Sequence, residues 1–125
     1  MVADDVLIRR AASARTGTVC TALSEMIQQR RWLLDEPALI SLENRGVAHI
    51  DGWIFAYRTM AMPDDERGTR IVEALVADNP RIREHACDLA GNLGLQLKDA
   101  LLSLLDDEDD AVREAARYNY DMLGA

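Results

Sequence analysis

Two stretches of this sequence repeat one another, and that repeat constrains the fold more than any other feature. Ile82-Arg83-Glu84 matches Val112-Arg113-Glu114 at a spacing of 30 residues, and the Leu-Gly pair at 93–94 recurs at 123–124. Before these matches the spacing is 29, because the turn of the first copy is one residue shorter. Turns tolerate changes of length better than packed helices do. The sequence therefore predicts a helix–turn–helix unit that occurs at least twice.

Helix start and stop signals divide the whole chain in the same way. Asn79-Pro80 is the clearest start, since Asn caps a helix and Pro suits its first turn. Thr18 and Asp51 are expected to be N-caps, and Gly46 a left-handed residue after a helix end. Eight short helices are expected, at about 4–14, 18–34, 37–44, 52–62, 66–77, 80–93, 97–105 and 110–123. No window shows the sustained alternation of a strand, so the fold class is expected to be all-α.

The pattern of this repeat resembles that of the HEAT repeat family, including its short bacterial variants. The pattern consists of an apolar pair, an Asp, a turn, a branched apolar residue with Arg, an Ala and then Leu-Gly. The clearest repeats are 66–94 and 97–124, and 1–62 would hold divergent N-terminal helix pairs. The resemblance implies an α-α superhelix, a small solenoid of about four helical hairpins forming a single domain over 1–125. Each pair would be too small to bury its own apolar face, so stacking would create the core.

The same resemblance implies a structural ladder in which Arg83 and Arg113 tie neighbouring repeats to the turn residues Asp78 and Asp107. Binding of phosphate by these arginines is the alternative interpretation.

The balance of charge narrows the class of partner. Twenty-two acidic residues against fourteen basic ones give a net charge of −8. Residues 1–31 carry +2, whereas 32–97 and 98–125 each carry −5. An acidic chain repels the phosphate backbone, so nucleic acid is not the expected partner and a basic protein is. With no apolar run of membrane-spanning length and no secretory leader pattern, a cytoplasmic location without membrane binding is expected.

Five consecutive acidic residues, Asp106, Asp107, Glu108, Asp109 and Asp110, precede the last helix. Their contiguity does not suit a calcium loop, which needs spaced ligands, a central Gly and a terminal Glu. One or two acids would suffice to cap the helix and complement its dipole. The remaining acids serve either solubility or an electrostatic surface for a partner, and both interpretations stay open.

Aromatic side chains provide the other candidate contacts for a partner. Trp53, Tyr118 and Tyr120 lie on expected helices, and the two tyrosines follow the acidic run. Each could belong to the core or could anchor a protein interface, where aromatic residues contribute much of the binding energy. The predicted partner-binding set is Asp106, Asp107, Glu108, Asp109, Asp110, Tyr118, Tyr120 and Trp53.

Catalytic and metal chemistry finds no support in the sequence. His85 and Cys87 stand two apart on a helix, so their side chains point in different directions and cannot share a metal. Cys20 and Cys87 lack CxxC spacing and are expected to be small buried hydrophobes. No hydrolase, zinc-protease or phosphate-loop motif occurs. We expect no catalytic residue, metal or cofactor.

Two classes of function are consistent with these features. The first is a protein-binding module without catalysis, such as an immunity or inhibitor protein that neutralises a basic toxin or enzyme. The second is an adaptor, chaperone or lyase-like HEAT-repeat accessory protein for a modification or repair enzyme. HEAT-like proteins include DNA-repair glycosylases, but these need a basic face, which a chain of charge −8 does not offer.

Overall fold

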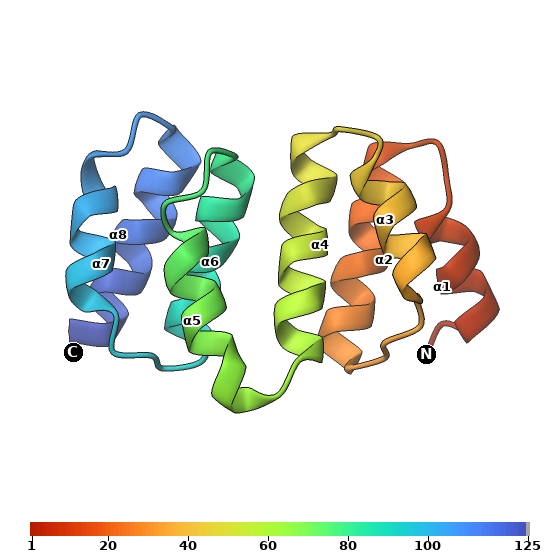
Figure 1. Cartoon of the computed structure of the whole chain (residues 1–125), viewed down its shortest axis with the longest axis horizontal. Helices are drawn as coiled ribbons and strands as arrows, with labels where there is room; N and C mark the ends of the chain where they lie inside the picture. Colours follow the sequence, from red (N-terminus) through yellow and green to blue (C-terminus); the bar gives the residue numbers. More distant parts are fainter. Residues whose placement is uncertain (125) are drawn as a thin grey trace. The chain divides into compact units, whose positions relative to one another are not determined.

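The computed structural model describes residues 1–124, and all of its regular structure in that range is helical (Figure 1). The helices are α1 (Asp4–Ala11), α2 (Thr16–Gln29), α3 (Glu36–Glu43), α4 (Ala48–Ala61), α5 (Asp64–Ala74), α6 (Pro80–Asn92), α7 (Lys98–Leu102), the short 3-10 helix η1 (Ser103–Asp106) and α8 (Asp110–Gly124). The all-α prediction is confirmed. Over this range no helix combines the length and the apolar character needed to cross a bilayer.

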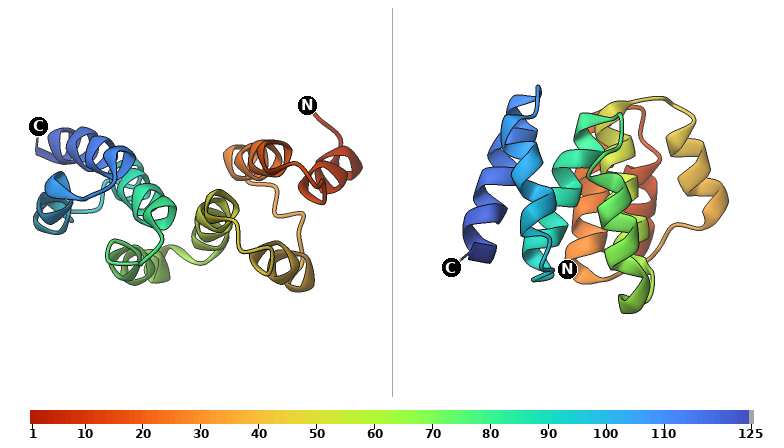
Figure 2. Two further views of the ribbon diagram at one scale, coloured as in Figure 1. Left: turned by 90° about the horizontal axis from the view of Figure 1, so that it is seen from above. Right: turned by 60° about the vertical axis from the view of Figure 1, so that its left-hand side comes forward.

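The chain divides into two compact units, each built of two helical hairpins (Figures 1 and 2). Unit 1 is Met1–Ala61 and holds α1 to α4, and unit 2 is Met62–Ala125 and holds α5 to α8. Within each unit the second helices of the hairpins pack together, α2 against α4 and α6 against α8. The expected superhelix would require all four hairpins to stack in one continuous series. This arrangement stays a prediction.

The core of unit 1 forms where α2 and α4 meet. Its buried members recur at helical spacing, which gives each helix one apolar face. They are Leu7, Ala11, Val19, Ala22, Leu23, Met26, Leu39, Leu42, Ile50, Ile54 and Tyr57. Trp53 and Trp32 are partly buried against this core, so unit 1 uses both tryptophans of the chain for packing.

The helix expected over 18–34 is wrong at both ends. It begins at Thr16 with Arg15 as N-cap, not at Thr18 as a cap, and it ends at Gln29, after which Arg30 is left-handed with φ of 53°. A residue of α4 binds the extended segment that follows: the Leu34 amide donates to the Tyr57 hydroxyl at 2.9 Å. No Gly or Pro marks this stop, so tertiary contacts decide it.

Asp51 was expected to be an N-cap, and this too is wrong. The helix α4 begins at Ala48, which places Asp51 within the first turn, where its Oδ1 is buried without a hydrogen-bond partner. Burial and the nearby Glu43 carboxylate raise the pKa of Asp51 above its ordinary value. Other start and stop signals are confirmed: Asn79 accepts from the Arg81 amide at 2.8 Å, and Gly46 has φ of 68°.

In unit 2, α6 and α8 are locked together by one buried amide. Asn119, 1% exposed, donates from Nδ2 to Asp88 Oδ1 at 2.9 Å and to the Ala115 carbonyl at 2.8 Å. Gly91 faces this side chain so closely that an added Cβ would lie 1.8 Å from Asn119 Oδ1. The close approach of the two helices therefore needs a residue without a side chain at position 91.

We predict that Gly91→Ala lowers the free energy of unfolding of unit 2 by about 1–3 kcal/mol, because the new methyl displaces Asn119 from its hydrogen bonds. Gly68→Ala in α5 is the matched control, since an added Cβ there meets no atom within 4 Å. It should stabilise the helix by about 0.5–1 kcal/mol. Urea unfolding followed by circular dichroism measures both changes, and equal effects of the two substitutions would contradict the lock.

Candidate protein-binding site

The turn before α8 is fixed by a two-bond ion pair from α6. Arg83 donates from Nε to Asp107 Oδ2 at 2.9 Å and from Nη2 to Asp107 Oδ1 at 3.0 Å. Only 11% of the Arg83 side chain and 8% of the Asp107 side chain are exposed. The Nη1 group also donates to the carbonyls of Ala77 and Asp78, at 2.8 and 3.0 Å. One guanidinium thus joins the turns of both hairpins of unit 2.

The pKa of Asp107 reflects this environment. Burial opposes its ionisation, but the hydrogen bonds from Arg83 and from the Asp109 amide outweigh burial and hold the pKa below its ordinary value. A folded pKa below the unfolded value means that the pair stabilises unit 2 above the ordinary Asp pKa. This contribution is lost as the pH falls through the folded pKa.

The five acids of the run alternate between two roles. Asp107 and Asp109 are half-buried: Asp109 receives the Arg81 guanidinium as an ion pair and caps α8 by accepting from the Val112 amide at 3.1 Å. Asp106, Glu108 and Asp110 are exposed. A structural role and an outward acidic surface therefore coexist in the same five residues.

The expected ladder of Asp78, Arg83, Asp107 and Arg113 is present in part. Arg83 joins the hairpins through Asp107, as the ladder predicts, but Asp78 accepts through its backbone carbonyl and its side chain is exposed. Arg113 donates to the Asp107 carbonyl at 2.6 Å and forms an ion pair with Asp110 on its own helix. The last repeat thus keeps the bond to the turn carbonyl and replaces the cross-repeat pair with a local one.

A shallow groove of about 440 Å³ opens between the two turns. Its apolar walls include Leu75, Leu104 and Val76, and Val76 is 81% exposed. Asp78 and Glu108 line it from the two turns, and the paired Arg83 and Asp107 complete the lining. We name the exposed residues Val76, Asp78, Asp106, Glu108 and Asp110 the acidic turn surface.

The three candidate aromatic residues lie in different settings. Tyr118 on α8 is 64% exposed. Tyr120 is half-buried, with the Lys98 ammonium 4.7 Å from its ring centroid, which is a cation–π contact. Trp53 belongs to unit 1 and packs against its core. Of the three, Tyr118 has the exposure that a contact residue needs.

The division into units sharpens the distribution of charge. Residues 1–61 contain seven acidic and seven basic side chains, so unit 1 is neutral. Residues 62–125 contain fifteen acidic and seven basic side chains, so the whole net charge of −8 belongs to unit 2. The charges of 1–31, 32–97 and 98–125 do not reveal this contrast, because 32–97 includes parts of both units.

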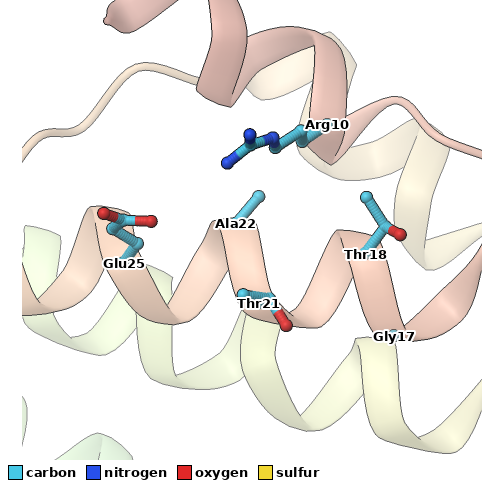
Figure 3. A pocket seen from close by; sticks show the side chains of 6 residues that line it. All are labelled: Arg10, Gly17, Thr18, Thr21, Ala22 and Glu25. Carbon is cyan, nitrogen blue, oxygen red and sulfur yellow. The ribbon is translucent and has the colours of Figure 1, made fainter. Parts of the chain in front are cut away.

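A polar groove of about 280 Å³ in unit 1 offers a comparison (Figure 3). Ala22 and Thr18 of α2 lie beneath it, and Arg10 of α1 and Glu25 of α2 approach it from different sides (Figure 3). The two charges offset each other. This groove therefore lacks the excess of one charge that distinguishes the acidic turn surface.

Cys87 of α6 is a buried thiol. Burial, together with the carboxylates of Asp88, Asp107 and Glu84, raises the pKa of Cys87 to about 12, so its thiol stays protonated at neutral pH. Within residues 1–124 no group of three metal-ligating side chains is close enough to hold an ion.

Sequence reasoning missed two members of the site. Arg81 belongs to it through Asp109, and its position directly after the Asn79-Pro80 start was the available signal. Val76 lies within the helix expected over 66–77, but α5 ends at Ala74 and Val76 is exposed. Val72, which lies four residues earlier on the same side of the helix, is 45% exposed, so this side faces away from the core.

The fold and the site together define an all-α protein of helical hairpins with an acidic, partly apolar turn surface. No family model matches the chain, and no match was found among curated proteins or solved structures. The HEAT-like assignment therefore rests on the internal repeat and stays a prediction.

We predict that Arg83→Met lowers the free energy of unfolding of unit 2 by about 3 kcal/mol, because it leaves the buried Asp107 carboxylate without its cation. The equivalent Arg113→Met should cost at most about 1 kcal/mol, since Arg113 pairs with a carboxylate at the surface. Urea unfolding measures the two losses. Equal losses would show that the two positions do not differ in role.

Proposed function

We propose that the protein is a non-catalytic binding module whose acidic turn surface takes a basic segment of another protein. The observation that carries the proposal is the arrangement of the turn before α8. Two of its acids are held inward by Arg81 and Arg83, and this fixes the exposed acids Asp106 and Glu108 beside the groove that Val76 lines.

Rigid presentation of the acids favours a specific partner over simple solubility. A carboxylate on a fixed turn loses less conformational freedom on binding than one on a flexible loop. The exposed Val76 gives apolar area beside these acids. A partner segment with a long cationic side chain suits both, because the stem of Lys or Arg covers apolar surface and its head meets a carboxylate.

An inhibitor or immunity role is the sharper form of this proposal. Excess negative charge on one unit would speed the encounter with a basic toxin or enzyme, and such steering weakens as salt rises. A cytoplasmic location belongs to the same proposal. An adaptor or chaperone role uses the same surface and differs only in the consequence of binding.

The test is capture of partners from the native lysate on the immobilised protein at low and at high salt, with quantitative mass spectrometry. We expect a basic protein that is released by salt. The double variant Asp106→Lys/Glu108→Lys should lose it by at least about tenfold, because two attractive contacts become repulsive.

The matched control is Asp65→Lys/Glu66→Lys, which changes the net charge equally with two exposed acids in the first turn of α5. It should retain the partner, provided that circular dichroism shows both variants folded. Equal loss in both variants would assign the binding to overall charge, and capture of no salt-sensitive basic protein would contradict the proposal.

A further inference from the structure

Unit 1 has a second concave feature, an apolar slot of about 140 Å³ between α1 and α3. Ala11 and Leu42 are buried in its lining, and Leu34 comes from the extended segment between α2 and α3. Ile8 of α1 lines it too and is 42% exposed. The slot is thus an apolar cavity with an accessible mouth.

Arg45 also lines this slot and is held in place by backbone groups. Its Nη1 donates to the Ser13 carbonyl at 2.7 Å and its Nη2 to the Ala12 carbonyl at 3.4 Å. Both carbonyls are neutral, and within residues 1–124 no carboxylate pairs with this guanidinium. Two other arginines of unit 1, Arg31 and Arg58, each have an acidic partner. Arg45 is therefore an exposed cation that backbone carbonyls position and that has no carboxylate partner in residues 1–124.

The geometry points to a docking site for a segment of another protein that places one large apolar side chain next to a carboxylate. The apolar side chain would fill the slot, and the carboxylate would accept from the remaining N–H groups of Arg45. Arg45 uses two of the five N–H donors of a guanidinium on carbonyls, so donors remain for an anion.

The size of the slot selects the apolar group. A cavity of about 150 Å³ has room for a benzene-sized molecule, so a Leu, Met or Phe side chain suits a slot of about 140 Å³. A longer chain would not fit, and an Ala would leave the walls without contacts. The site differs from the acidic turn surface in unit and in charge, and it selects an acidic partner segment.

Blocked dipeptides provide the test with the full-length protein. N-acetyl-Leu-Glu amide carries both features, while N-acetyl-Leu-Gln amide lacks the charge and N-acetyl-Ala-Glu amide lacks the large side chain. Titration of the ¹⁵N-labelled protein should shift the amide signals of Ile8, Ala12 and Ser41 with the first dipeptide. The other two should bind at least about threefold more weakly.

Two pairs of variants separate the slot from the surface around it. Ala12→Leu should abolish the shifts by filling the slot from an exposed position, and Ala14→Leu, exposed but outside the lining, should leave them unchanged. Arg45→Gln should weaken the Leu-Glu dipeptide to the level of the Leu-Gln dipeptide, and Arg9→Gln on the exposed side of α1 should not.

Absence of shifts with the Leu-Glu dipeptide, or shifts that survive Ala12→Leu, would overturn the proposal. A second copy of this chain is the competing occupant, because α8 exposes Tyr118 and Met122. Sedimentation velocity decides between them. We expect a monomer at all concentrations, and self-association that Ala12→Leu abolishes would overturn the assignment to another protein.

Discussion

The pairing of Arg83 with Asp107 organises unit 2, because it joins two turns that are separate in sequence. The guanidinium reaches the Ala77 and Asp78 carbonyls of its own hairpin and the carboxylate of the next one. With both side chains nearly buried, loss of either partner leaves a charge in a poorly hydrated place. Asn119 with Asp88 and Gly91 holds the same two helices farther along. The acidic turn surface, which we propose as the binding site, is the exposed side of the two turns that Arg83 and Asp107 join.

The acidic run combines a structural role with an exposed charged surface in one short sequence. Its half-buried members are neutralised by Arg81 and Arg83, so they add little to the outward field. The exposed members supply that field from fixed positions. Unit 1 is neutral and has an apolar slot lined in part by Arg45, and we propose partners of opposite charge for the two units.

Local signals in the sequence predicted what local physics decides. Asn79-Pro80 and Gly46 were identified correctly because a cap and a positive φ depend on the residue itself. The end of α2 could not be found in this way, since it falls at Arg30, a left-handed residue that is neither Gly nor Asn. Asp51 failed as a cap because the helix already begins three residues earlier, at Ala48.

The candidate site, too, was predictable from the sequence only in part. The repeat identified Arg83 and Asp107 as a pair, because equivalent positions in a repeat meet equivalent neighbours. The alternation of buried and exposed acids was not visible, since a row of identical charges carries no periodic signal. The exposure of Val76 was not predicted either, since an apolar residue can lie on the exposed side of a helix, as Val72 does one turn earlier.

Titration of the side-chain carboxyl carbons of the acidic run by ¹³C NMR tests most directly whether Arg81 and Arg83 hold two of its carboxylates inward. The account predicts that Asp107 and Asp109 titrate below the ordinary Asp range, because the hydrogen bonds and cations that hold them inward outweigh the burial that opposes their ionisation. If Asp107 titrated at or above that range, the carboxylate would not be held by Arg83, and the fixed acidic turn would not exist.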